Sequence, residues 1–247
     1  MREIVLIGVG ADAKAVIAAA TRAGLQVRAA YDDQKSRVGN SILGVPIVGP
    51  LGDAESAGLP GVLGLTDPLE RKRAVELLDI SWATIVHPQA FIHPSSVLGP
   101  GTVILEGAVV QPSVTIGSHV LIGANVTVSH DCVIQDFVCL GPGVDLAGTV
   151  CVGEGACFQV GSLVMPNIRI GKWTTIGPRS AVIRDVPDRV AVDGTPARPA
   201  NDPPRTGGGS YPIVPPIVSL LIGTLFTMLA AGVARRSAYF SRLRRVD

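Results

Sequence analysis

The sequence is poor in aromatic residues and in charge, and neither charge sign is in excess. Of its 247 residues only 4% are aromatic and 17% are charged, whereas 47% are hydrophobic. Lys and Arg number 21 and Asp and Glu 20, which argues against a protein that binds nucleic acid through surplus basic residues. A core with so few aromatic rings must consist mainly of Val, Ile, Leu and Ala, a composition typical of stacked strands.

The cysteines and the N-terminus exclude further classes. Four cysteines occur without C-x-x-C spacing, which disfavours a zinc ribbon or a thioredoxin-like redox site. Met-Arg-Glu and the short apolar run after it lack the length of a secretory signal peptide. We therefore expect the chain to begin in the cytoplasm.

Residues 1–85 alternate short β-branched runs with helix-like stretches, which predicts a small Rossmann-like α/β domain. A glycine-rich turn at residues 8–13 fits G-x-G-x-x-A, and Asp32 lies 22 residues beyond Gly10. Glycines in such a turn let phosphates approach the backbone, and the acidic residue binds the ribose. The alternative is a tight turn followed by a solvated acidic loop.

From residue 91 to residue 186 a six-residue repeat continues without interruption for sixteen hexads. The second position is always apolar, from Ile92 to Val182, the sixth is small or β-branched, and the third is glycine in seven hexads. A period of six is typical of a parallel β-helix, in which three hexads close one triangular coil. We expect the second position to point inward, glycine and other small residues to form the corners, and residues eighteen apart to stack about 4.8 Å apart over five coils.

His130 is the residue of this repeat that points most clearly to chemistry. It precedes Asp131, and Gly148 lies eighteen residues further on, in the next coil. An imidazole beside an unobstructed backbone N–H suits acyl transfer, because the base takes a proton from the attacking group and the donor stabilises the oxyanion. The alternative is a surface histidine at a turn.

These features resemble the hexapeptide-repeat sugar acyltransferases, particularly the sialic acid O-acetyltransferases and the nucleotide-sugar N-acetyltransferases of the bacillosamine pathway. The resemblance covers residues 3–198. The stretches that carry it are His-Asp-Cys-Val-Ile-Gln-Asp-Phe-Val at 130–138, Gly-Pro-Gly at 141–143, Leu-Ala-Gly at 146–148, Ile-Val-His-Pro at 85–88 and Gly-Thr-Pro-Ala-Arg at 194–198.

The resemblance implies a left-handed β-helix at residues 86–198, assembled as a homotrimer, with acetyl-CoA bound between neighbouring prisms and no metal. His130 would be the general base, Asp131 would raise its basicity, and Gly148 would meet the acetyl carbonyl. The positions that match acetyl-CoA contacts are Cys139, Gly148, Val160 and Pro178. The positions that match the nucleotide-sugar site are Gly10, Ala11, Asp12, Asp32 and Asp33.

Three positions depart from the family pattern. The family has histidine where this chain has Asp12, asparagine where it has Gly123, and often a second histidine where it has Cys139. A thiol donates a hydrogen bond only weakly, so these departures alter the contacts expected of the acceptor.

The leading hypothesis is an acetyl-CoA-dependent transferase that acts on a sugar hydroxyl or amine, with the sugar nucleotide-linked, in polysaccharide or glycan synthesis. The departures support a second hypothesis, a catalytically degenerate, membrane-tethered scaffold or nucleotide-sugar-binding protein. Transfer to an amino acid such as serine is a weaker alternative, because serine acetyltransferases resemble an all-helical domain fused to the coils.

Two alternatives concern the histidines and cysteines. A γ-class carbonic anhydrase shares this fold and needs three histidines per zinc, whereas His119 and His130 occupy different hexad positions, which disfavours a shared metal. Cys139 and Cys157 occupy the first position of hexads one coil apart. That spacing permits a disulfide, although two stacked thiols are the simpler interpretation in a reducing cytoplasm.

The C-terminal part of the chain has a different character. The Pro- and Gly-rich residues 199–212 indicate a linker, and residues 213–234 carry no charge over 22 positions, enough to span a bilayer. We expect residues 213–247 to form a hydrophobic helix with a basic tail that attaches the cytoplasmic enzyme to the inner membrane. Five arginines after residue 234 favour a cytoplasmic C-terminus, so a re-entrant or interfacial anchor, or a helix packed on the trimer, stays open.

Overall fold

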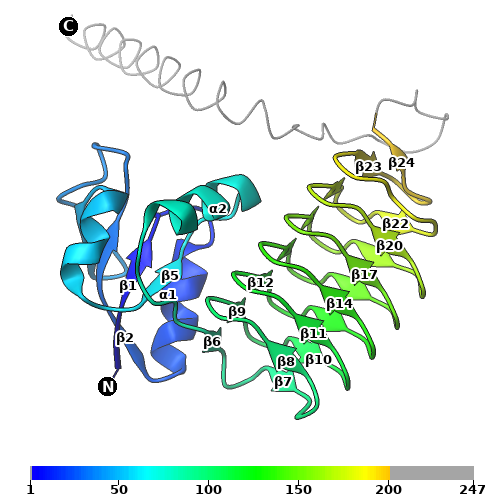
Figure 1. The fold of residues 1–247 in the computed structure, drawn as a ribbon, viewed down its shortest axis with the longest axis horizontal. Helices are drawn as coiled ribbons and strands as arrows, with labels where there is room; N and C mark the ends of the chain where they lie inside the picture. Colours follow the sequence, from blue (N-terminus) through cyan, green and yellow to red (C-terminus); the bar gives the residue numbers. More distant parts are fainter. Residues whose placement is uncertain (1, 201–247) are drawn as a thin grey trace, which may run out of the picture. The chain divides into compact units, whose positions relative to one another are not determined.

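A computed structural model describes residues 2–200 (Figure 1). Most of the predicted linker and all of the predicted hydrophobic helix and basic tail at 213–247 lie outside the described residues. Among residues 2–200, no helix combines the length and the apolar character that crossing a bilayer requires.

The N-terminal part is an α/β unit with a five-stranded sheet of order β3-β4-β2-β1-β5. Four strands are parallel, and β3 pairs antiparallel with β4. The strands are β1 (Arg2–Ile7), β2 (Leu25–Tyr31), β3 (Ser41–Ile42), β4 (Val45–Gly49) and β5 (Gly61–Leu63). The predicted α/β region is confirmed.

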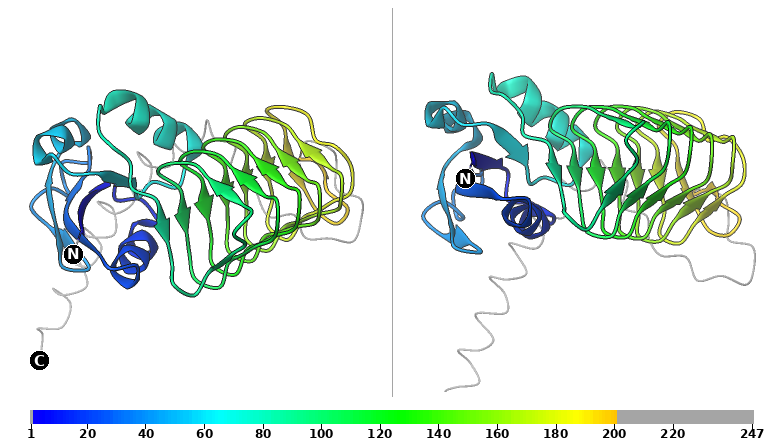
Figure 2. Two further views of the ribbon diagram at one scale, coloured as in Figure 1. Left: turned by 60° about the horizontal axis from the view of Figure 1, so that its bottom comes forward. Right: turned by 90° about the horizontal axis from the view of Figure 1, so that it is seen from below.

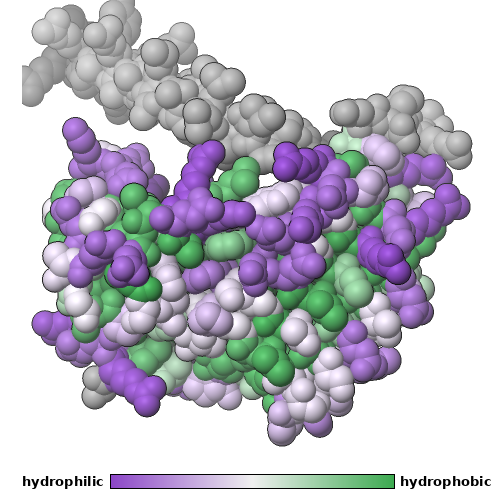
Figure 3. Space-filling view, in the orientation of Figure 1, coloured by the Kyte–Doolittle hydropathy of each residue, from purple (hydrophilic) through white to green (hydrophobic). Residues whose placement is uncertain are grey.

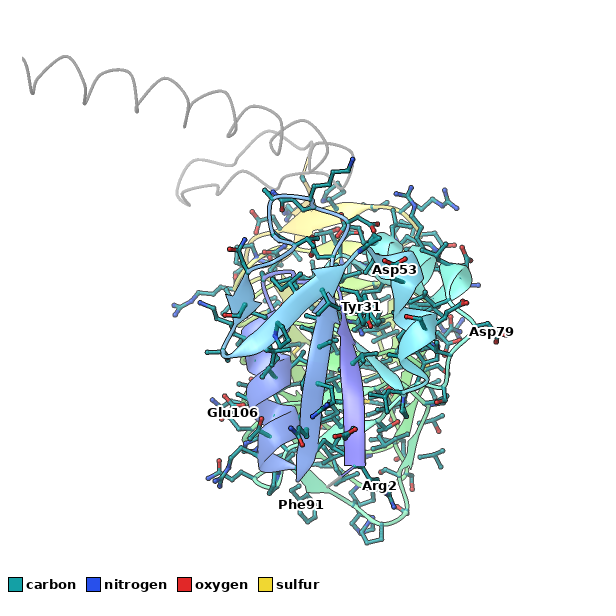
Figure 4. All side chains as sticks on the ribbon, turned by 90° about the vertical axis from the view of Figure 1, so that its left-hand side faces the viewer. Arg2, Tyr31, Asp53, Asp79, Phe91 and Glu106 are labelled. Atoms are coloured by element: carbon teal, nitrogen blue, oxygen red, sulfur yellow. The ribbon has the colours of Figure 1, made fainter. Side chains whose placement is uncertain are left out.

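Helices cover the sheet because β1 alternates its apolar side chains between two clusters. Ile4 and Leu6 pack with residues of α1 (Ala13–Arg22). Val5 and Ile7 pack with residues of the 3-10 helix η1 (Leu51–Ala57) and of α2 (Pro68–Leu77). In Figure 4, α1 lies to the left of β1 and β2, and Asp53 of η1 lies to their right.

Residues 85–199 form three stacks of very short strands, coloured green to yellow in Figures 1 and 2. The first stack holds β7 (Phe91–Ile92), β10 (Val109–Val110), β13 (Thr127–Val128), β16 (Asp145–Leu146), β19 (Leu163–Val164) and β22 (Ala181–Val182). The second stack holds β8 (Val97–Leu98), β11 (Thr115–Ile116), β14 (Val133–Ile134), β17 (Cys151–Val152) and β20 (Arg169–Ile170). The third stack holds β6 (Ile85–Val86), β9 (Val103–Ile104), β12 (Leu121–Ile122), β15 (Cys139–Leu140), β18 (Cys157–Phe158), β21 (Thr175–Ile176), β23 (Ala191–Asp193) and β24 (Arg198–Pro199).

The stacks have the register that the hexads predict. Strands pair in parallel with partners eighteen residues apart, as Thr127 does with Asp145. Second-position side chains from Ile104 to Val182 are at most 3% exposed and fill the prism. The arrangement is consistent with the left-handed β-helix expected from the sequence.

The coils extend beyond the repeat at both ends. The third stack begins with β6, one hexad before residue 91. At the other end Thr175 pairs with Ala191, sixteen residues away, so the last coil is shorter by two residues. The antiparallel strand β24 then pairs with β23.

The structure corrects the role predicted for the glycines of the third hexad position. Their φ angles are not positive; instead, the next coil leaves no room for a side chain, since a Cβ on Gly141 would lie 2.7 Å from the Phe158 carbonyl oxygen. The left-handed corner conformation falls at the fifth position, where Gly143 has a φ of 67° and Asp131 a φ of 59°. The corners therefore also accept residues with side chains, even aromatic ones such as Phe137.

Helix α2 joins the α/β unit to the coils. The guanidinium of Arg71, fully buried, donates from Nη1 to the Leu65 carbonyl at 2.8 Å and from Nη2 to the His119 carbonyl at 2.7 Å. Beside it, Lys72 Nζ donates to Glu154 Oε1 at 2.8 Å and lies 5.4 Å from the ring centroid of Trp173. These contacts hold the loop after β5 against the side of the prism.

Gly141→Ala is expected to destabilise the coils, because overpacking against the next coil costs about 1–3 kcal/mol. Gly143→Asn is the matched control, since its Cβ would meet only Gly161 Cα, at 4.0 Å, and asparagine tolerates a positive φ. Thermal unfolding followed by circular dichroism should give a Tm several degrees lower for Gly141→Ala than for Gly143→Asn. The reverse order would contradict the role assigned to third-position glycines.

His119 should make the fold sensitive to acid. Burial and the neighbouring Arg71 guanidinium lower the pKa of His119 from 6.5 to about 4. The unfolded chain therefore takes up the proton first, and stability present above pH 6.5 is lost as the pH falls toward 4.

His119→Asn removes the titrating ring and suits the φ of 56° at this position. Between pH 7 and pH 4.5 the variant should lose roughly 2 kcal/mol less of its free energy of unfolding than the wild type. Urea unfolding at the two pH values measures this difference. An equal loss in both proteins would show that His119 does not titrate with folding.

Candidate active site

The backbone places His130 at a corner of the prism. It occupies the fourth position of its hexad, two residues after the end of β13, and Gly148 occupies the same position one coil further on. We call the column of fourth-position residues after the first stack the first corner, and that after the third stack the third corner. The first corner therefore carries His130 and Gly148.

Asp131 holds the ring of His130 in one orientation. Its Oδ2 lies 2.7 Å from His130 Nδ1, and its φ of 59° turns the backbone so that adjacent side chains can meet. A proton on Nδ1 that bonds to the carboxylate leaves Nε2 as the basic nitrogen. The side chains of His130 and Asp131 are 59% and 58% exposed in the single chain, so Nε2 is accessible.

The ring occupies the space that a side chain at position 148 would need. A Cβ on Gly148 would lie 2.7 Å from both Cε1 and Nε2 of His130. Glycine at 148 is therefore required by the ring rather than by backbone strain, because its φ is not positive. This close approach brings the imidazole of one coil against the bare backbone of the next.

Fourth-position amides take no part in the backbone–backbone hydrogen bonds between coils. Some of them donate instead to a side-chain oxygen of a neighbouring coil, namely those of Ser118, His130, Glu154 and Lys172. First- and third-position N–H groups donate to the next coil and fifth-position groups to the previous one, as from Thr149 to the His130 carbonyl. Proline, which lacks an N–H, accordingly fills the fourth position at 94, 100, 112, 142, 166 and 178. Within residues 2–200 the N–H of Gly148 has no hydrogen-bond acceptor, so it is available to an incoming carbonyl oxygen.

The other positions matched to acetyl-CoA lie elsewhere on the prism. Val160 and Pro178 stack at the third corner, and Val160 is 54% exposed. Cys139 belongs to β15, is 3% exposed and packs in a core cluster that includes residues of α1. One chain therefore does not bring Cys139, Val160 and Pro178 together with His130.

The thiols of Cys139 and Cys157 are neighbours in successive coils, and both cysteines are free. The hydrogen bond between the two thiols and the burial of Cys139 raise the pKa of Cys139 well above its usual value. The same hydrogen bond lowers the pKa of Cys157. Stacked thiols, the simpler interpretation of this pair, are what the structure contains.

Asp32 is buried and bonds to the glycine-rich turn, so it is not part of a solvated acidic loop. It is 6% exposed, and its Oδ2 accepts from the Val9 N–H at 2.7 Å and from Arg37 Nη1 at 2.9 Å. Arg37 Nη1 also donates to the Val9 carbonyl at 2.6 Å. Asp33 is different, since its Oδ1 accepts from the Leu51 N–H at the start of η1.

The turn itself lies against the loop that follows β5. Gly10 donates to the Gly64 carbonyl, and a Cβ on Gly10 would lie 2.8 Å from that oxygen. Ala11 and Asp12 complete the turn, and Asp12 Oδ2 is buried without a hydrogen-bond partner among the described residues. The carboxyl ends of β1 and β5 meet here, where parallel α/β sheets bind ligands.

Reasoning from the sequence missed the charged residues of α2. Glu70 and Arg73 line a cavity beside the turn, together with residues from the ends of β1 and β2. The sequence shows a charged helix at 68–78, but its periodicity does not say which side chains face the sheet edge. Only the packing of α2 against the loop after β5 identifies them. Among residues 2–200, no three His, Cys, Asp or Glu side chains form a cluster suited to a metal.

Known sequences share the coils of this chain. Residues 95–130 and 113–148 match the family described as Bacterial transferase hexapeptide (six repeats). The acyl-[acyl-carrier-protein]–UDP-N-acetylglucosamine O-acyltransferase of Aliivibrio fischeri strain MJ11 is 36% identical over 72 residues, or 29% of this chain and 28% of that protein. The chain thus spans little more than a quarter of the length of such curated relatives.

Solved structures match both parts of the chain. Perosamine N-acetyltransferase from Caulobacter crescentus, in complex with CoA and GDP-perosamine, is 33% identical with a TM-score of 0.75 over 82% of this chain and 98% of that one. The acetyltransferase domain of PglB from Neisseria gonorrhoeae, in complex with acetyl coenzyme A, is 28% identical with a TM-score of 0.74 over 80% and 98%. The predicted resemblance is thereby confirmed: the chain belongs to the hexapeptide-repeat sugar acyltransferase family.

Proposed function

We propose that the protein transfers an acetyl group from acetyl-CoA to a hydroxyl or amine of a nucleotide-linked sugar, with His130 as general base. The observation that carries this proposal is the close approach of the His130 ring to Gly148, whose backbone N–H has no hydrogen-bond acceptor within residues 2–200. The relatives support the substrates, because the Caulobacter enzyme binds CoA and GDP-perosamine and the Neisseria domain binds acetyl coenzyme A.

The proposed reaction needs no covalent enzyme intermediate. Nε2 of His130 takes the proton from the acceptor hydroxyl or amine as its oxygen or nitrogen attacks the thioester carbonyl. The Gly148 N–H donates to the oxyanion of the tetrahedral intermediate. The C–S bond then breaks, the acetyl group stays on the sugar, and coenzyme A leaves as a thiol with the proton from the imidazolium. Asp131 stabilises that imidazolium between the two proton transfers.

A second copy of the chain is part of the proposal. His130 and Gly148 lie at the first corner and Val160 and Pro178 at the third, so one ligand that touches both sets must lie between two prisms. Apolar side chains on the first and second sides of the prism are exposed, namely Phe91, Val97, Val133, Leu163, Met165 and Ile183. Figure 3 shows hydrophobic side chains on the surface along the coils. A homotrimer of triangular prisms covers such faces and completes three sites.

The degenerate alternative rests on the departures from the family pattern. The buried thiol of Cys139 cannot act as an accessible polar contact, and a side chain at Gly123 would collide with the carbonyl of Leu140. Neither change alters the contact of His130 with Gly148. Acetyl-CoA titration separates the hypotheses, since a scaffold that has lost the site does not bind the thioester.

His130→Ala should lower the rate of acetyl transfer by about 10²–10⁴-fold, the usual contribution of a general base. Release of the coenzyme A thiol across a panel of nucleotide-sugars measures the rate. His93→Ala is the matched control, because that ring bonds to Ser95 on the same side of the prism, two coils earlier. A wild-type rate in His130→Ala, with a trimer confirmed by light scattering, would exclude the mechanism.

We also propose that residues 213–234 attach the enzyme to the inner membrane with its catalytic part in the cytoplasm, an expectation drawn from sequence alone. The full-length chain should sediment with membranes on ultracentrifugation. Leu225→Lys with Leu229→Lys should release it, because each lysine near the centre of a span costs about 2.5–3.5 kcal/mol. Full-length wild-type protein that remains in the supernatant would contradict the attachment.

A further inference from the structure

A cavity of about 280 Å³ lies at the carboxyl ends of β1, β2 and β5. In Figure 4, Tyr31 at the end of β2 and Asp53 of η1 mark this end of the sheet, and Arg2 marks the opposite end. The lining residues are Gly8, Asp32, Asp33, Arg37, Leu51, Leu65, Glu70 and Arg73. They come from every loop at this edge of the sheet and from one face of α2.

Three of the charged lining residues already make hydrogen bonds within the fold, and one of them is Asp33, which accepts from the Leu51 N–H. Asp32 accepts from the Val9 N–H, from Arg37 and, through Oδ1 at 2.9 Å, from the Gln34 N–H. Arg37 Nη1 donates both to Asp32 Oδ2 and to the Val9 carbonyl. Because these groups already position the turn, they are poor candidates for distinguishing one ligand from another.

Glu70 and Arg73 are not committed in this way. They lie three residues apart on α2, so their side chains share one face of the helix. Within residues 2–200 neither side chain makes a hydrogen bond or a salt bridge; only the Glu70 backbone N–H is used, by the N-cap Asp67. The cavity therefore presents a carboxylate acceptor beside a guanidinium donor.

Glu70, like Arg73, is exposed in the single chain, so its carboxylate is open to a ligand in the cavity. Partial burial, and then the neighbouring Asp67 carboxylate, raise its pKa, whereas Arg73 opposes this shift. A ligand N–H that donates to this carboxylate forms a charge-assisted hydrogen bond. The Leu51 and Leu65 side chains add apolar walls suited to the faces of a planar ring.

The bases of nucleotides differ in how they match this pair. Guanine presents two adjacent donors, N1–H and N2–H₂, followed by the acceptor O6. Cytosine offers a carboxylate only its N4 amino group, and adenine only its N6 amino group. Uracil and thymine place a carbonyl on each side of a single N–H, so a carboxylate there meets acceptor oxygens.

We propose that this cavity binds the guanine base of a nucleoside diphosphate sugar, with Glu70 accepting from N1–H and N2–H₂ and Arg73 donating to O6. The proposal names the nucleotide of the substrate and rests on the proposed function only for the sugar attached to it. The glycine-rich turn at residues 8–13 lies next to the cavity. With the base in the cavity, this turn is positioned to bind the diphosphate.

Isothermal titration of the full-length protein with GDP, UDP, CDP and ADP tests the proposal without relying on catalysis. GDP should bind at least about tenfold more tightly than each of the others, as expected for one bidentate pair. Glu70→Gln keeps the size of the side chain and should weaken GDP binding by a similar factor while leaving UDP binding nearly unchanged. Glu76→Gln makes the same charge change on α2 away from the cavity and is the matched control.

The outcomes separate this inference from the proposed function. Equal affinity for GDP and UDP, equal weakening of all nucleotides by Glu70→Gln, or no nucleotide binding in a protein that releases thiol from acetyl-CoA would each overturn the guanine assignment. GDP preference that Glu70→Gln abolishes supports it. If that preference appears in a protein that releases no thiol with any GDP-linked amino sugar or sugar, the cavity assignment stands and the proposed acetyl transfer fails.

Discussion

Backbone hydrogen bonds between successive coils hold residues eighteen apart in one register, and the rest of the molecule depends on this constraint. The Thr127 N–H donates to the Val144 carbonyl and the Ser129 N–H to the Leu146 carbonyl, both at 2.9 Å, and the same pattern repeats along the prism. Because a shift of one residue would turn every inward side chain outward, the apolar second position enforces the register. Position along the axis and position around the prism then follow from residue number alone.

The site is a consequence of that register. His130 and Gly148 come together because they occupy the same hexad position in neighbouring coils, and the Gly148 N–H takes no part in the backbone hydrogen bonds between coils. The proposed catalytic geometry thus requires little beyond a histidine, its acidic neighbour and one glycine. In the proposed function the nucleotide-sugar is selected elsewhere, at the loops of the α/β unit, which Arg71 joins to the coils through the His119 carbonyl.

Much of this could be predicted from the sequence because the repeat is short and regular. The inward second position, the stacking of Val160 on Pro178 and the position of Gly148 beside His130 all follow from counting by eighteen. The prediction that glycines form the corners is wrong for the third position. A sequence does not distinguish a glycine that needs a positive φ from one that needs space. Long-range packing could not be predicted either, because no periodicity indicates that Cys139 shares a core cluster with residues of α1, or that Asp32 is buried against Val9.

The rate of thiol release in Gly148→Ala, with acetyl-CoA and a nucleotide-sugar that the wild type acetylates, tests the central claim most directly. A methyl group there would lie 2.7 Å from the His130 ring, so it displaces the base from the donor without removing either. The account predicts a loss of activity comparable to that of removing the imidazole, in a protein that remains folded and trimeric. A wild-type rate would contradict the claim that stacking an imidazole on a bare glycine creates the active site.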